Sequence, residues 1–270
     1  MMNNKGVHVR AVAIGIAAWA GGMFGHAAIA GQAPAAPQAP QTPQASAPID
    51  LTGYWVSIVT ESWRFRMVTP ARGDYASIPI TKAALDVADR WNAARDTAEG
   101  NLCKAYGGAA MLNIPGRLHI SWQDENTLKI EMDNGQQTRL LHFGKGDPGA
   151  PSLQGYSTAE WVNIPRIQGG GQGPTAPRVP TPKGPGMGTL KVRTTNLLPG
   201  YLRKNGVPHS ADAVVTEFWD LRVETDGKPW ITVTVEVNDP LYLLEPYLTS
   251  PNFRKEADGS KWSPEPCGLD

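Results

Sequence analysis

"RLHISWQDENTLKIEMDNGQQTRLLHF", residues 117–143, is the most regular segment of this chain. It holds three runs of alternating apolar and polar residues, 117–122, 127–132 and 137–143, separated by short polar segments. Asn134-Gly135 is a strong signal for a tight hairpin turn, because these residue types tolerate the positive φ angles that such turns need. The segment therefore predicts three consecutive antiparallel strands.

This turn also predicts which residues lie opposite one another. The expected pairs on one face are Met132 with Gln137, Ile130 with Arg139, and Leu128 with Leu141. On the other face, His119 is expected opposite Glu131, which we interpret as an exposed ion pair on a solvated surface.

Similar strand-like segments flank this region, at 51–60, 63–69, 154–163, 189–197, 213–223 and 229–237. One helix is expected over 81–96, with Thr81 as its cap and an apolar stripe through Leu85, Ala88, Trp91 and Ala94. About nine strands and one helix predict a mainly β fold. We expect an antiparallel, barrel-like or strongly curved sheet, similar to a lipocalin, with one helix between early strands.

The N-terminus has the pattern of a secretory signal peptide. Lys5, His8 and Arg10 precede a short apolar run at 11–25, and the small residues at 28–30 predict cleavage after Ala30. Segment 31–48, rich in Pro, Ala and Gln, predicts an extended linker. A single domain is expected over 49–270, with a flexible Gly/Pro insert at about 164–188. The protein is therefore expected to be periplasmic or secreted and to lack a membrane span.

Composition restricts the possible partners. The chain has 25 basic and 25 acidic residues, and removal of the signal peptide with its two basic residues leaves 23 against 25. This balance argues against nucleic-acid binding, which needs a basic face. The two cysteines, Cys103 and Cys267, predict a disulfide in an exported chain, with two separate thiols as the alternative.

Several motifs resemble those of a widespread group of exported bacterial proteins. They are GYSTAEW (155–161), GTLKVRTTNL (188–197), the Pro-His-Ser and Thr-Glu positions of GVPHSADAVVTEFWD (206–220), an Asp-Pro turn at 239–240, and the late Cys267. The resemblance covers most of 51–267 and implies this fold and export, but no activity. The opening Gly-x-Trp, Gly53 to Trp55, is similar to the first strand of lipocalin-like barrels.

One strand carries a candidate catalytic residue. In 213–223, Glu217 shares an apolar face with Val215 and Trp219. An unpaired carboxyl group in such surroundings is costly and suits a general acid or base. His209, in the turn just upstream, is its candidate partner, oriented by Ser210 or Asp212.

Structural alternatives exist for both residues. Glu217 would form a salt bridge with an arginine of a neighbouring strand, such as Arg64, Arg66 or Arg193, and His209 would brace a turn. A metal site built from His209, Asp212 and Glu217 has irregular spacing, so we predict neither a metal nor a cofactor.

These observations support three hypotheses. The first is an exported, cofactor-independent enzyme of isomerase, lyase or hydratase type that acts on a small, largely apolar or aromatic molecule in a barrel cavity. Glu217 and His209 would be catalytic, and the lining would include Tyr54, Arg64, Arg66 and Trp219. The second is a periplasmic binding or carrier protein without catalysis, and the third is a structural envelope protein with a filled core.

Overall fold

The computed structural model describes residues 41–163 and 188–269. The predicted signal peptide lies outside the described residues, as do most of the predicted linker and nearly all of the predicted insert. The described end of the linker, 41–48, lies against the barrel. There, the Trp161 indole donates to the Pro43 carbonyl at 2.9 Å, and the Gln44 N–H donates to the Glu125 carbonyl at 3.2 Å.

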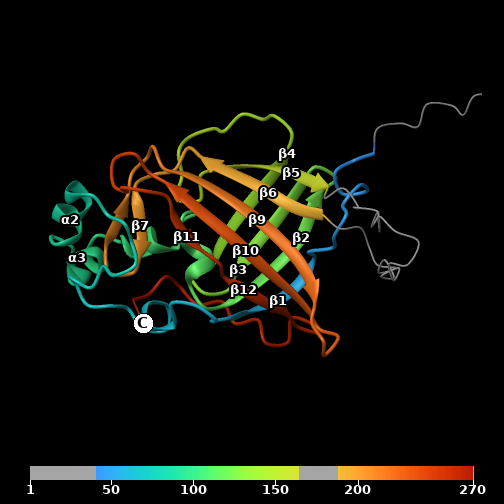
Figure 1. Cartoon of the computed structure of the whole chain (residues 1–270), viewed down its shortest axis with the longest axis horizontal. Coiled ribbons are helices and arrows are strands. Elements are labelled where there is room, and N and C mark those ends of the chain that lie inside the picture. Colours follow the sequence, from blue (N-terminus) through green and yellow to red (C-terminus); the bar gives the residue numbers. More distant parts are fainter. Residues whose placement is uncertain (1–40, 164–187, 270) are drawn as a thin grey trace, which may run out of the picture. The chain divides into compact units, whose positions relative to one another are not determined.

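Nine strands close into a β-barrel (Figure 1). Around the barrel they run in the order β10 (Pro229–Asn238), β12 (Asn252–Lys255), β1 (Gly53–Ile58), β2 (Arg117–Asp124), β3 (Thr127–Met132), β4 (Gln137–Phe143), β5 (Tyr156–Asn163), β6 (Gly188–Thr195) and β9 (Val214–Val223), which returns to β10. The expectation of a mainly β, lipocalin-like barrel is therefore confirmed.

Three short strands complete the β structure. β11 (Tyr247–Thr249) pairs with the last residues of β10, beyond the stretch that pairs with β12. β7 (Gly200–Arg203) and β8 (Val207–His209) form a separate two-stranded sheet. Within the described barrel, β4 and β5 are the one parallel pair, and this pairing covers only residues 141–143 and 157–159.

The predicted register of the central meander is confirmed. Met132, Ile130 and Leu128 lie opposite Gln137, Arg139 and Leu141. His119 lies opposite Glu131, and its Nδ1 is 3.0 Å from the carboxylate. Gly135 and Gln136 adopt positive φ angles of 87° and 52°, so the positive-φ pair begins one residue later than the predicted Asn134-Gly135.

The helical region differs from the expectation. The predicted strand over 63–69 is wrong, because its first half is the helical turn α1 (Trp63–Arg66). The single helix expected over 81–96 is two helices, α2 (Lys82–Ala88) and α3 (Ala93–Ala98). Asn92 separates them, since its extended backbone and its side chain, which accepts from the Arg95 N–H, cap a new helix. The 3₁₀ turns η1 (Leu102–Tyr106) and η2 (Met111–Asn113) follow before β2.

Alternating residues of the barrel strands form a filled core. Trp55 and Trp219 are fully buried, and aliphatic side chains surround them, including Leu118, Ile120, Leu128, Ile130, Leu141, Leu190, Val192, Val215, Ile231 and Val233. Side chains fill the interiors of small barrels in this way.

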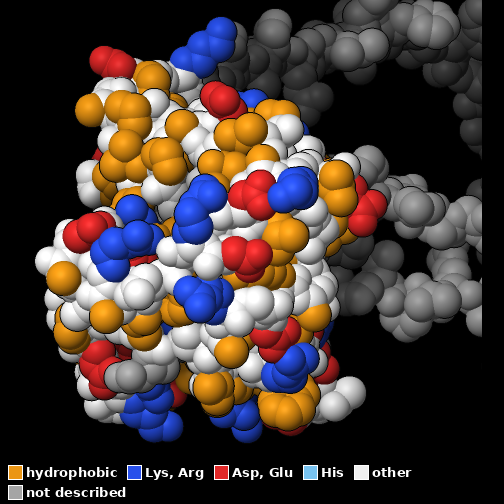
Figure 2. Space-filling view, turned by 90° about the vertical axis from the view of Figure 1, so that its left-hand side faces the viewer, with side chains coloured by type: hydrophobic (Ala, Val, Ile, Leu, Met, Phe, Trp, Pro, Cys, Tyr) orange, Lys and Arg blue, Asp and Glu red, His pale blue; other side chains and the backbone are white. Residues whose placement is uncertain are grey.

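The surface carries charges of both signs. Figure 2 shows the side on which α2 and α3 lie, where basic and acidic side chains are interspersed and neither sign forms a continuous patch. Of the helices in the described part of the chain, none has the length and apolar character that a membrane crossing requires.

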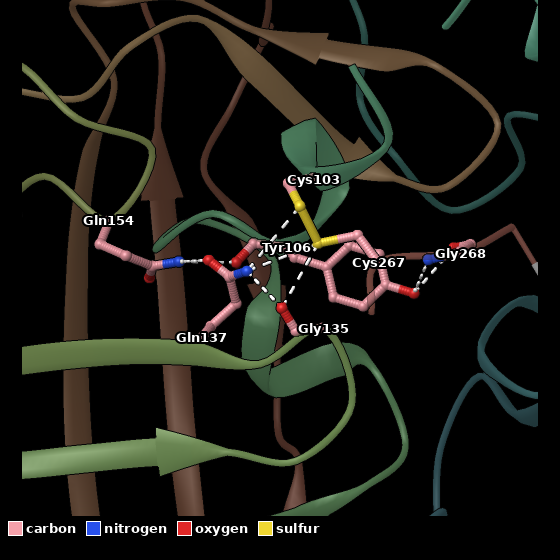
Figure 3. Close-up of a disulfide and its surroundings, with 7 residues drawn as sticks. All are labelled: Cys103, Tyr106, Gly135, Gln137, Gln154, Cys267 and Gly268. Carbon is pink, nitrogen blue, oxygen red and sulfur yellow. Dashed lines mark hydrogen bonds between the residues drawn. A yellow bond between two sulfur atoms is a disulfide. The ribbon is translucent and has the colours of Figure 1, made fainter. Parts of the chain in front are cut away.

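The predicted disulfide is confirmed. Cys103 in η1 is bonded to Cys267, 164 residues later, with the two Cα atoms 5.2 Å apart. Figure 3 shows how neighbouring side chains hold this region together: Gln137 donates to the Cys267 sulfur at 3.4 Å, and the Tyr106 hydroxyl donates to the Gly268 carbonyl at 2.7 Å. The bond therefore ties the C-terminal segment to η1 beside the β3–β4 turn.

Gly135 is expected to be a sensitive turn glycine. A Cβ at this position would overlap the ring of Tyr106, whereas a Cβ at Gly73, with a similar φ of 91°, would meet nothing. Gly73→Ala should therefore cost about 1 kcal/mol, for the positive φ alone. Gly135→Ala should cost about 1–3 kcal/mol more, because the ring must also move. Urea denaturation of both variants measures the difference, and equal losses would contradict the packing argument.

Candidate functional site

Glu217 forms a buried ion pair across the interior of the barrel. Its Oε1 accepts from Arg139 Nη1 at 2.7 Å, and its Oε2 accepts from the Trp219 indole at 3.1 Å. Arg139 also donates to the hydroxyls of Ser157, at 3.0 Å, and Thr194, at 2.6 Å. All five side chains are buried, and each polar group that faces the pair has a partner.

Glu217 pairs with an arginine, but not with any of the three arginines that we named. Arg64, Arg66 and Arg193 do not contact it, and Arg139 on β4 does. The sequence held a signal for this pairing, because Arg139 was itself expected on an apolar face, opposite Ile130. Two lone charges of opposite sign on interior faces are expected to meet, since an unpaired buried charge is costly.

His209 is buried in β8, away from this pair. Its Nδ1 is 3.1 Å from the Ser210 carbonyl, so Nδ1 carries the proton and donates, while the buried Nε2 has no partner among the described residues. Desolvation lowers the pKa of the imidazole. The structure shows no hydrogen bond between His209 and Glu217, and the catalytic roles of both residues stay predictions.

The residues predicted to line a cavity are dispersed. Tyr54 stacks on the exposed face of His119, with ring centroids 4.3 Å apart, and Arg64 forms a surface ion pair with Asp74. Trp219 lies in the barrel core. Of this set, Arg66 alone borders the pocket described next.

A narrow pocket lies at the end of the barrel beside β7 and β11. It offers about 30 Å³ to water-sized spheres. Its walls come from four separate segments: 61–66 with α1, 105–114 with η1 and η2, 202–204 at the end of β7, and 247–249 in β11. Ser62, one of the lining residues, is exposed, so the pocket reaches the surface there.

Three residues that line this pocket carry buried polar atoms without partners in the described part of the chain. Arg66 Nη1, Asn113 Oδ1 and Thr249 Oγ1 are buried, belong to lining residues and lack a hydrogen-bond partner among the described residues. Buried polar groups are normally paired, so three such atoms in one pocket indicate a site that receives a polar group. The sequence did not predict this site, because its residues share no motif. Of its residues, Arg66 was predicted to line a cavity, but one inside the barrel.

Burial perturbs the ionisable groups around the pocket. Desolvation lowers the pKa of Arg66, and the nearby Glu61 carboxylate opposes this effect. Desolvation likewise lowers the pKa of Arg203, which Tyr247 and Asp74 oppose. The pocket therefore holds positive charge in surroundings with little solvent, where electrostatic interactions are strong.

Loss of the Glu217 charge should destabilise the protein. Glu217→Gln leaves Arg139 buried without its counterion, so the free energy of unfolding should fall by about 3 kcal/mol. Glu160→Gln is the control, because Glu160 pairs with Lys191 on the surface and its loss should cost less than about 1 kcal/mol. Urea denaturation measures both variants. Unchanged stability of Glu217→Gln would contradict a structural role for the pair.

His209 should make stability depend on pH. The imidazole pKa is lower in the folded protein than its ordinary value of 6.5, so the unfolded chain binds the proton more readily. Stability from this residue is present above pH 6.5 and is lost as the pH falls through 6.5 towards the folded pKa, at up to about 1.4 kcal/mol per pH unit. His209→Asn, which still donates to Ser210, should show a shallower decline in denaturation experiments between pH 7 and 5. Parallel profiles would contradict this assignment.

No protein-family model, curated protein or solved structure matches this chain. Within the described residues, no group of three or more His, Cys, Asp or Glu side chains is placed to hold a metal ion. The geometry of the barrel and of the pocket at its end is therefore the basis for a functional proposal.

Proposed function

We propose that this protein is an exported binding protein that holds a small molecule in the pocket at the end of its barrel. The observation that carries the proposal is the convergence of Arg66 Nη1, Asn113 Oδ1 and Thr249 Oγ1 on one pocket. Leaving buried polar groups unsatisfied costs about 1–3 kcal/mol each, and a ligand or bound water that pairs with them recovers that free energy.

The walls of the pocket suit an organic ligand. Apolar side chains lie among the polar ones, namely Phe65, Ala105, Ala110, Ile114 and Leu202. Pockets for small molecules commonly combine apolar walls with a few convergent polar groups. Export is part of the proposal and rests on the predicted signal peptide, on the resemblance to exported bacterial proteins and on the disulfide, which persists in oxidising compartments.

The geometry favours binding over acid–base catalysis. Neither Glu217 nor His209 lines this pocket, and both oxygens of Glu217 already accept hydrogen bonds from protein groups. The pocket thus has polar groups that a ligand can use. The predicted acid, Glu217, is instead engaged by protein groups, and it shares no hydrogen bond with the predicted base, His209. A carrier without catalysis is therefore the function that the described residues support best.

Filling the pocket should abolish binding. Ala110 is buried and lines the pocket, so Ala110→Leu places three additional carbon atoms in it. A library of small organic acids, amides, alcohols and amines is screened by protein-observed NMR. We expect a subset to shift the amide signals of 61–66, 110–114 and 202–204 in the wild type and not in Ala110→Leu.

Two further variants make this test specific. Ala257→Leu adds the same side chain on the exposed surface and should bind like the wild type. Thr249→Val removes one unpartnered hydroxyl at nearly constant volume and should weaken binding, which covers the case of poor folding in Ala110→Leu. A screen in which no compound of any charge perturbs the pocket signals would overturn the proposed function.

A further inference from the structure

We infer that the pocket at the end of the barrel is an acid-binding site, in which Arg66 and Arg203 hold the carboxylate of a small organic acid. This inference rests on the proposed function and adds the chemical class of the ligand. Three features carry it: the charges that line the pocket, the hydrogen bonds that the two arginines already make, and the size of the pocket.

The lining carries an excess of positive charge. Arg66 and Arg203 border the pocket, and Glu61 is the one acidic residue among its lining residues. The Glu61 carboxylate is itself engaged, because it accepts a hydrogen bond from the Ser250 N–H. Bringing these cations together beside a narrow, partly buried space is unfavourable unless an anion joins them.

Neither guanidinium has an acidic partner in the described part of the chain. Arg66 donates to the Asn113 carbonyl at 2.8 Å and lies 3.4 Å from the Ser57 hydroxyl. Arg203 donates to the Ala76 carbonyl at 3.0 Å, is hydrogen-bonded to the Tyr247 side chain and packs over the Phe65 ring at 4.1 Å. These contacts fix the orientation of both side chains without a salt bridge to a described carboxylate, which pre-organises them for an anion.

The unpartnered atoms provide donors for such a group. Arg66 Nη1 and the Thr249 hydroxyl both donate, and the Asn113 amide presents its NH₂ group after a rotation of 180°, which exchanges its oxygen and nitrogen. Ionised acceptors bond more strongly to these donors than neutral acceptors do. A carboxylate therefore satisfies the site better than an amide or a water molecule.

The size of the pocket favours a carboxylate over a larger anion. About 30 Å³ is available, and a water-sized atom needs roughly 10–15 Å³ of such space. This space suits a small, planar carboxylate better than a bulkier tetrahedral phosphate ester. The remainder of the ligand would lie outside the mouth at Ser62.

The test compares molecules that share one body and differ in the polar group. Benzoate, benzamide, benzylamine and phenyl phosphate are titrated into the wild-type protein, and dissociation constants are taken from the NMR shifts of the pocket amides. We expect benzoate to bind about tenfold or more tightly than benzamide, since hydrogen bonds to a charged group are stronger by 1 kcal/mol or more. Benzylamine should not bind, and phenyl phosphate should bind more weakly than benzoate.

Charge-removing variants locate the interaction. Arg66→Gln and Arg203→Gln should each weaken benzoate binding about tenfold, while benzamide binding changes little. Arg193→Gln is the matched control, because Arg193 is exposed on β6, and it should bind benzoate like the wild type.

The possible outcomes separate this inference from the proposed function. Equal binding of benzoate and benzamide at the pocket overturns the acid-binding inference and leaves the binding function intact. Tighter binding of phenyl phosphate than of benzoate overturns the choice of a carboxylate. Shifts confined to residues outside the pocket overturn the site, and the absence of binding by any compound of the wider library overturns the proposed function as well.

Discussion

The ion pair between Arg139 and Glu217 determines how this barrel is built. Arg139 on β4, Ser157 on β5, Thr194 on β6 and Glu217 on β9 form a polar row across four neighbouring strands. The row crosses the interior face among mainly apolar side chains. Removing a charge from water costs several kcal/mol, so each member of the row needs the others. The register of all four strands is therefore coupled to one hydrogen-bonded network.

This network lies where short turns do least to set the register of neighbouring strands. β2, β3 and β4 form a meander through short turns, but β4 and β5 pair in parallel over three residues each. A parallel pairing receives no register from a hairpin turn. Arg139 compensates by donating directly to Ser157, and the Ser157 and Thr194 hydroxyls are 2.8 Å apart, which extends the coupling to β6. A one-residue slip of any of these strands would turn its polar group to the outer face and leave the others without partners, so the network selects one register.

The sequence predicts the features that local patterns encode. Alternation located the barrel strands, and Asn134-Gly135 set the register of β3 and β4, because strand periodicity and turn chemistry act over a few residues. The 63–69 segment was predicted as a strand because Trp, Phe and Val favour strands, but its first four residues form a helical turn with no buried side chain. The pairing of Glu217 with Arg139 could have been predicted from the sequence, since Arg139 is a lone charge on a mainly apolar strand face. The pocket could not have been predicted, because its walls come from four segments that only the fold brings together.

A filled barrel changes where a ligand can bind. Lipocalin-like barrels of similar strand number can hold a ligand inside, but here Trp55, Trp219 and the Arg139–Glu217 network occupy that space. The additions to the barrel instead create the pocket: α1, the 3₁₀ turns, β7 and β11 all meet at one end. The disulfide from η1 to the C-terminal segment and the Arg66–Asn113 hydrogen bond hold these additions in place. The barrel thus acts as a rigid support, and Arg66 and Arg203 lie on the elements that differ most from a simple barrel, as expected for a site placed on a stable scaffold.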